Sequence, residues 1–135
     1  MPLVGGGGAP NVSGGANPSG TGSSINYIGN HAYANSGAVT VAQSDTIQLN
    51  FTTGSQYIVA KFRFNTEATD DDIRFQVNFD SQTVQGYTIG SSNNHAFHSA
   101  LDLLIPPYTH VTTTGYNESS SSGRTTYASI SGRVY

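Results

Sequence analysis

A period of two in the apolar residues constrains the fold of this chain more than any other feature of its sequence. In the segment 73–80, which reads IRFQVNFD, every second residue is apolar and the residues between them are Arg, Gln, Asn and Asp. This period places alternate side chains on opposite faces of a β-strand, so the segment is predicted to be a half-buried strand. No segment shows a sustained helical period.

Eight segments are predicted to form strands: 37–43, 46–53, 57–65, 73–80, 83–89, 100–105, 109–116 and 125–135. Gly, Asn, Asp, Ser and Pro separate them, as turns require. Short strands at this spacing are typical of a sandwich or a barrel. We therefore predict an all-β fold in which residues 25–135 form a single jelly-roll-like β-sandwich. An immunoglobulin-like sandwich is the alternative.

The alternation also predicts which side chains share a strand face. Within each of four strands, the apolar side chains are expected on one side and the polar ones on the other. These apolar sets are Ile47, Leu49 and Phe51; Ile58, Ala60, Phe62 and Phe64; Ile73, Phe75, Val77 and Phe79; and Ala128, Ile130 and Val134.

The first 24 residues have a different composition from the rest of the chain. The segment 1–24 holds eight of the 16 glycines and three of the five prolines, and it has no aromatic or charged residue. Such a segment cannot bury enough apolar surface to offset its ordering entropy, so we expect a flexible arm. Its few anchor residues are the candidate partner-binding residues: Leu3, Val4, Pro10 and Val12.

The low charge content argues against several classes of protein. Only 10% of the residues are charged, the net charge is −3, and Lys and Arg together number five, which argues against a nucleic-acid partner. No apolar run approaches the roughly 18 residues needed to cross a bilayer, so no membrane partner is expected. There is no cysteine, which excludes a disulfide framework and thiolate chemistry.

Two motifs could bind a metal, and we predict that neither does. Asp70, Asp71 and Asp72 offer carboxylates for a cation such as calcium, but the run lacks the interleaved glycine bend of a calcium loop. A solvated turn is the favoured interpretation. His95 and His98 form an HxxH pattern without a nearby acidic partner, which is a weak zinc signal. We expect no metal and no cofactor.

No catalytic constellation is evident either. The carboxylates of Glu67, Asp102 and Glu118 are scattered along the chain, so no glycosidase pair stands out. The serine-rich sequence contains no GxSxG elbow to support a catalytic triad. We predict that the chain is not an enzyme and has no catalytic residues.

Tyrosine is abundant for so small a domain, with eight copies in 135 residues. Tyrosine is favoured at interfaces because its ring buries area while its hydroxyl keeps a hydrogen-bonding tip. Strands that are poor in charge and rich in tyrosine leave a surface that a lone monomer rarely exposes. We therefore expect a homo-oligomer, with a trimer favoured over a dimer.

Four segments give the chain a resemblance to a known family. They are YIVAKFRFN at 57–65, the acidic turn 70–72 before IRFQVNFD, LDLLIPPYTHV at 101–111, and the terminal SGRVY at 131–135. From about Gly37 to Tyr135, the sequence resembles small β-sandwich proteins encoded among the structural genes of tailed phages of aquatic bacteria. The resemblance excludes the arm.

The resemblance implies a capsid decoration or cement protein. Such a protein binds the major capsid protein on the outside of an assembled shell, and it carries no catalytic residues. The expected location is therefore the capsid surface of a virion. The first residues have neither the basic nor the apolar part of a signal peptide, so synthesis in the host cytoplasm is expected. Two other binding roles stay open: a receptor- or carbohydrate-binding head domain, and a single-jelly-roll coat protein.

Overall fold

Ten β-strands make up the secondary structure of the residues that the computed structural model describes, 25–67, 70–90 and 100–135. The all-β prediction is confirmed. Among these residues, no helix is long and apolar enough to cross a membrane. The strands are β1 (Asn26–Ile28), β2 (His31–Asn35), β3 (Val39–Val41), β4 (Thr46–Thr52), β5 (Ile58–Thr66), β6 (Ile73–Phe79), β7 (Gln82–Ile89), β8 (Leu101–Ile105), β9 (His110–Asn117) and β10 (Arg124–Val134).

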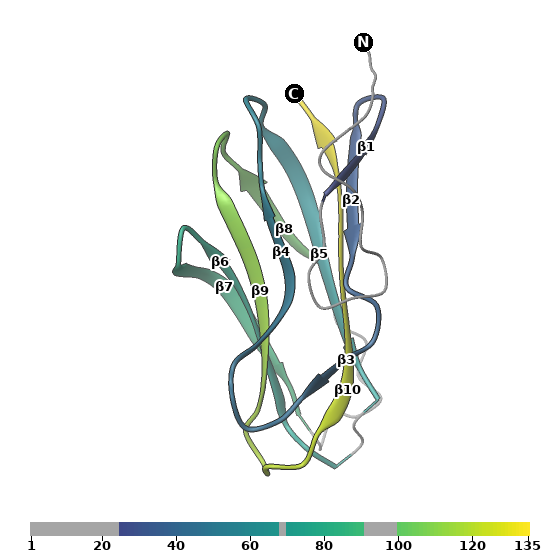
Figure 1. Ribbon diagram of the computed structural model, residues 1–135, viewed down its shortest axis with the longest axis vertical. Helices are drawn as coiled ribbons and strands as arrows, with labels where there is room; N and C mark the ends of the chain where they lie inside the picture. Colours follow the sequence, from purple (N-terminus) through teal and green to yellow (C-terminus); the bar gives the residue numbers. More distant parts are fainter. Residues whose placement is uncertain (1–24, 68–69, 91–99) are drawn as a thin grey trace.

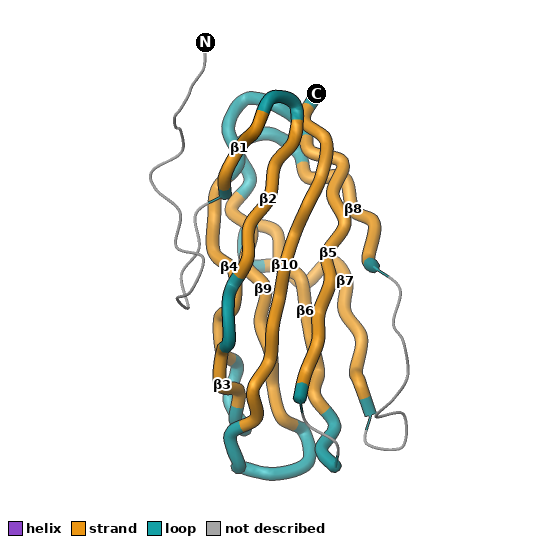
Figure 2. The backbone as a smooth tube through the Cα atoms, turned by 90° about the vertical axis from the view of Figure 1, so that its right-hand side faces the viewer, coloured by secondary structure: helices purple, strands orange, loops and turns teal. Residues whose placement is uncertain are grey.

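The strands form two antiparallel sheets that face each other as a sandwich (Figure 1). The larger sheet has the order β1-β2-β10-β5-β8, and β3 also pairs with β10. The smaller sheet has the order β4-β9-β6-β7. The side view shows the larger sheet broadside, with the long β10 between β2 and β5 (Figure 2).

The pairings between strands are nested. β3 pairs with β10, β4 with β9, β5 with β8, and β6 with β7. The first and third of these pairs lie in the larger sheet, and the second and fourth in the smaller one. The path is that of one long hairpin wrapped so that successive pairs alternate between the sheets. Its tip is the two-residue turn Asp80–Ser81, where both residues have the positive φ that a type I′ turn requires.

The predicted alternation is confirmed along β5, β6 and β10. The inward-facing apolar residues of these strands are buried between the sheets, except Phe79, which is half-buried at the end of β6. Lys61, Arg63 and Arg133 are exposed. Three aromatic rings pack together in the core. Phe64 and Phe75 are stacked with their centroids 4.9 Å apart, and Tyr87 makes T-shaped contacts with both rings. The burial of apolar surface between the two sheets is the main stabilising contribution to such a fold.

The prediction for Ile47 was wrong. The register of β4 against β9 shifts between Ile47 and Leu49, and the resulting irregularity leaves Ile47 43% exposed. Gln48 is buried in its place, and its amide nitrogen donates a hydrogen bond to the hydroxyl of Thr126, 2.8 Å away. A bulge of this kind changes which residues of a strand face the core.

The hairpin formed by β1 and β2 was not predicted. The inward residues of β2 are Ala32 and Ala34, both buried, and β2 pairs with the C-terminal half of β10. Gly29 has a φ of +58° at the first of the two turn residues, where type II′ hairpins place glycine. The hairpin adds two strands to the larger sheet. The predicted arm, residues 1–24, lies outside the described residues.

Candidate functional site

The strongest candidate site is the outward surface of the larger sheet, which we call the outer face. Its side chains come from five strands, and the register of these strands arranges them in rows. The outer face comprises Ile28, His31, Tyr33, Val59, Lys61, Arg63, Asp102, Leu104, Ser131 and Arg133.

One row of the outer face crosses the sheet from edge to edge. In the register, Ile28 pairs with His31, His31 with Arg133, Arg133 with Val59, and Val59 with Leu104. Directly opposed side chains on antiparallel strands lie about 5 Å apart, so these five residues form a continuous band. Its three apolar members are Ile28, Val59 and Leu104, which are 65%, 49% and 55% exposed. A row with this much exposed apolar surface is a candidate contact surface.

The neighbouring row is more polar. It runs from Tyr33 through Ser131 and Lys61 to Asp102. The ammonium group of Lys61 lies 2.6 Å from a carboxylate oxygen of Asp102, and both side chains are exposed. Beyond this row, a guanidinium nitrogen of Arg63 lies 3.5 Å from the hydroxyl of Ser131. This part of the outer face is therefore rich in hydrogen-bond donors.

A shallow groove of about 540 Å³ lies in the outer face. Apolar side chains of Ile28, Tyr33 and Val59 line it together with His31, Lys61 and Arg133. The guanidinium of Arg133 also lies 5.7 Å from the ring centroid of Tyr135, within cation–π range. A groove with apolar walls and cationic groups suits a partner that presents small side chains and negative charge.

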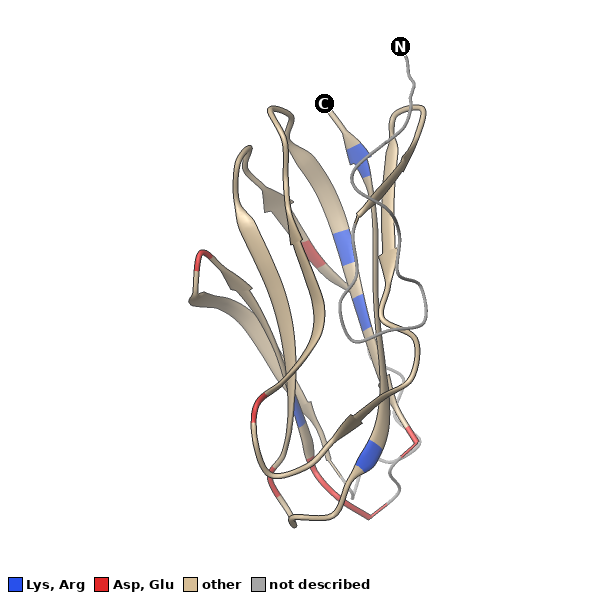
Figure 3. Cartoon of the chain, in the orientation of Figure 1, with Lys and Arg blue, Asp and Glu red and all other residues tan. Residues whose placement is uncertain are grey.

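Apart from Asp80 in the β6–β7 turn, the charged residues that the structure describes lie on the outer face or at one end of the sandwich (Figure 3). At this end lie the connections β3–β4, β5–β6 and β9–β10, and we call it the acidic end. The carboxylates in these three connections are those of Asp45, Glu67, Asp70, Asp71, Asp72 and Glu118. Arg74 and Arg124 are the two cations among them, and both are ion-paired there. The other three cations of the chain, Lys61, Arg63 and Arg133, lie on the outer face.

The aspartate run at the acidic end is built into the structure rather than fully solvated. Asp71 is buried, and its carboxylate accepts hydrogen bonds from Arg124 Nε at 2.6 Å, Asn117 Nδ2 at 2.9 Å and the Ser120 hydroxyl at 3.3 Å. The hydrogen bonds from Arg124 and Asn117 lower the pKa of Asp71 below its ordinary value. Asp70 makes a second ion pair with Arg124 at 3.3 Å. The predicted solvated turn is therefore only partly correct.

Two residues of the aspartate run, Asp70 and Asp71, direct carboxylate oxygens at Arg124. In the part of the chain that the structure describes, no group of three or more His, Asp or Glu side chains is arranged to hold an ion. Asp71 already directs a carboxylate oxygen at Arg124 and Asn117. His95 and His98, the other candidate metal ligands, lie outside the described residues.

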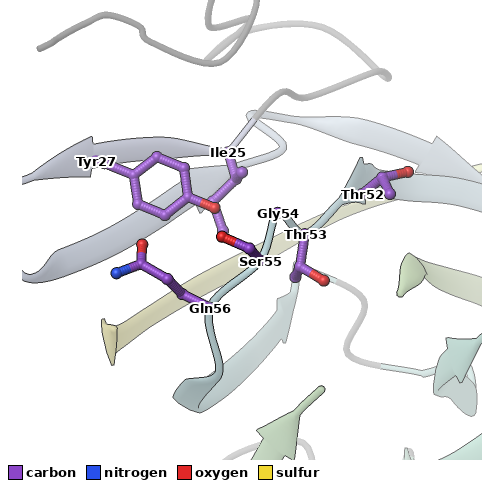
Figure 4. Close-up of a pocket in the computed structure, with 7 residues that line it drawn as sticks. All are labelled: Ile25, Tyr27, Thr52, Thr53, Gly54, Ser55 and Gln56. Carbon is purple, nitrogen blue, oxygen red and sulfur yellow. The ribbon is translucent and has the colours of Figure 1, made fainter. Parts of the chain in front are cut away.

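A second hollow opens where the described chain begins (Figure 4). It is lined by Ile25 and Tyr27, from the start of the β1 region, and by residues 52–56 at the end of β4 and in the following loop. Thr53 anchors that loop: its hydroxyl lies 2.8 Å from the carbonyl oxygen of Pro106 and accepts a hydrogen bond from Thr109 N at 2.9 Å. Burial raises the pKa of Tyr27. Ile25, which lines the hollow, is the first residue that the structure describes.

The predicted partner-binding residues of the arm, Leu3, Val4, Pro10 and Val12, lie outside the described residues. Six of the eight tyrosines fall into two environments, and the other two, Tyr116 and Tyr127, are half-buried. Tyr27 and Tyr87 pack against the core, whereas four tyrosines have large exposed fractions: Tyr33, Tyr57, Tyr108 and Tyr135.

Sequence reasoning missed the part of the outer face that belongs to β1 and β2. Ile28, His31 and Tyr33 all lie on this unpredicted hairpin. The available signal was the period of two in HAYAN, where alanine is the inward residue. Alanine contributes little to an apolar pattern, which explains the omission. Comparisons with protein families, with curated proteins and with solved structures found no match to this chain.

Proposed function

We propose that this chain is a structural protein of a virus particle: a capsid decoration or cement protein that binds the outside of an assembled shell through its sandwich and its N-terminal arm. In this role its partners are the major capsid protein and further copies of itself. It acts by binding and has no catalytic step. Its location is the capsid surface, after synthesis in the host cytoplasm.

The nested strand pairing supports a finer assignment of the fold, to a single jelly roll. β2 and β3 pair with successive parts of β10, so together they occupy one strand position. Counted in this way, and with the short edge strand β1 set aside, each sheet has four strand positions and the nested pairs alternate between the sheets. Eight strands in two such sheets are the arrangement of a jelly roll, which is frequent in viral capsids and in lectin domains. The fold alone does not decide between these functions.

The observation that carries the proposal is the exposed apolar row of the outer face. Ile28, Val59 and Leu104 lie on three different strands of one sheet, and the row holding them spans its width. Surfaces of this kind on small proteins mark contacts with other proteins. A decoration protein that works in a closely packed array needs such a surface, and a rigid cysteine-free sandwich suits a particle exposed to the environment.

The proposed task of the arm is to tether the sandwich to the shell. Residues 1–24 precede Ile25, which lines the hollow at the β4–β5 loop. Leu3, Val4 and Val12 supply apolar anchors in a segment without charge. A second, linked contact raises the overall avidity by an effective-concentration term, and avidity can rise 10²–10⁴-fold without any change in the main interface.

Cosedimentation with shells of the encoding virus, stripped of this protein, tests the proposal. The wild-type chain should bind to saturation, and the variant Leu3→Ser/Val4→Ser/Val12→Ser should bind at least tenfold more weakly. The matched control Asn11→Ser/Asn17→Ser changes the same arm without removing an apolar anchor and should bind as the wild type does. No binding by the wild-type chain would overturn the decoration role. Closed shells formed by this chain expressed alone would instead favour the coat-protein alternative.

A further inference from the structure

The outer face and the acidic end are complementary in charge. The outer face carries Lys61, Arg63 and Arg133 against Asp102, a formal charge of +2. The acidic end carries six carboxylates against Arg74 and Arg124, a formal charge of −4. Both surfaces belong to every copy of the chain, so each copy presents a basic surface and an acidic one to its neighbours. Complementary potentials of this kind steer association and set its register.

The two surfaces also differ in shape. The outer face is broad and holds the groove between Ile28, Tyr33 and Val59. The acidic end is made of connecting loops, and the β9–β10 connection contains only small residues after Glu118, namely four serines and a glycine. A loop of small hydroxyl-bearing residues can enter a shallow groove that large side chains would not fit. Its hydroxyl and carbonyl groups would then meet the donors of Lys61 and Arg133.

We propose that the acidic end of one copy docks on the outer face of a second copy of this chain. The contact is heterologous, because the two surfaces lie on different parts of the molecule. Repetition of such a contact closes into a ring when the rotation between copies allows it. The apolar row of the outer face is buried in the contact, and Arg63 and Arg133 face the carboxylates of Asp70 and Asp72. This inference rests on the proposed function and deepens it, because it assigns the outer face to the contacts between copies in the array on the shell.

Changing the charge of each surface tests the contact in the full-length chain. The face variant is Arg63→Glu/Arg133→Glu and the end variant is Asp70→Lys/Asp72→Lys. The end variant keeps Asp71, which lies 2.6 Å from Arg124 Nε in the wild-type structure. Analytical ultracentrifugation at 0.1 M salt should show the wild type as an oligomer, and each variant alone should associate at least tenfold more weakly. At 1 M salt, the wild type should also dissociate, because screening shortens the reach of the charges.

A mixture of the two variants gives the decisive result. The altered face of one variant has a formal charge of −2. The altered end of the other is neutral overall but places ammonium groups at positions 70 and 72, opposite the new carboxylates of that face. The unchanged end, at −4, and the unchanged face, at +2, also attract each other. An equimolar mixture should therefore regain association at contacts between unlike variants, as hetero-dimers and longer alternating assemblies. A three-membered ring would keep one contact between like variants, so recovery is scored as hetero-association and not as the wild-type oligomer. The control Gln82→Glu/Gln85→Glu adds two negative charges on β7 of the other sheet and should associate as the wild type does. Thermal melting of each variant verifies that it is folded.

Three outcomes would overturn this inference: a wild-type chain that stays monomeric at 0.1 mM, folded variants that associate as the wild type does, or a mixture of impaired variants that does not regain association. The inference and the proposed function fail separately. A monomeric chain that still binds stripped shells leaves the decoration role in place. A chain that forms the predicted oligomer but does not bind shells retains the docking contact and loses the decoration role.

Discussion

Replacing Phe75 with alanine should destabilise the sandwich more than any other single truncation on β6. Phe75 is fully buried, stacks on Phe64 with the planes 19° apart, and meets the edge of Tyr87. Removing a buried phenylalanine ring typically costs about 3–5 kcal/mol of unfolding free energy, because transfer and cavity terms add. For a domain of this size, that corresponds to a fall in Tm of roughly 10–20 °C. Such a loss is a large part of an ordinary domain's stability.

Thermal or urea unfolding measures this cost directly, with Gln76→Ala as the matched control. Gln76 is the next residue on β6 and its side chain points away from the core, so its truncation should change the unfolding free energy by about 0.5 kcal/mol or less. Equal losses for Phe75→Ala and Gln76→Ala would refute the strand register on which the core depends. Arg74 is unsuitable as the control: it forms ion pairs with Asp45 at 3.0 Å and Glu118 at 3.3 Å.

Three further predictions follow from the buried polar groups and the arm. The pKa of Asp71 is lowered in the folded state, so its contribution to stability is complete above the unfolded pKa of about 4 and is lost as the pH falls through the folded pKa. The variant Asp71→Asn should therefore melt at a lower temperature than the wild type at pH 6, and its Tm should fall less steeply towards pH 2. A curve of Tm against pH that is parallel to that of the exposed variant Asp102→Asn would contradict this. The variant Gln48→Met should change the unfolding free energy by less than about 1.5 kcal/mol. The reason is that the Thr126 hydroxyl keeps its hydrogen bond to Val39 O, and the amide oxygen of Gln48 has no partner among the described residues. A larger loss in urea unfolding would show that the amide of Gln48 is essential to the bulge. Deleting 1–24 should leave the Tm nearly unchanged, and a chain that unfolds without this segment would show that the arm belongs to the core.

The sequence predicted strands well where both faces of the strand have distinct chemistry. β5, β6 and β10 alternate large apolar residues with charged or polar ones, and their neighbours in the sheets impose the same two-sided environment. The bulge in β4 could not be predicted in this way, because it depends on how β4 pairs with β9, a strand more than 60 residues away along the chain at Leu49 and Thr113. A local pattern contains no information about that register.

The candidate site was harder to predict than the fold. The aspartate run was recognisable in the sequence, but its partners Asn117 and Arg124 lie in the β9–β10 region, and only the folded chain brings them together. The outer face depends in the same way on cross-strand register: Leu104, Val59 and Arg133 are distant in the sequence and adjacent in the sheet. The separation of basic and acidic surfaces follows from these pairings, so composition alone could not reveal it.

Electron cryomicroscopy of the virus particles, with and without this protein, tests the decoration role most directly. A difference map should show added density at regular positions on the outside of the shell, with each unit the size of a small sandwich and in contact with the major capsid protein. Identical shells in the two maps would contradict the decoration role, and so would added density confined to the tail, which would instead favour a receptor-binding head.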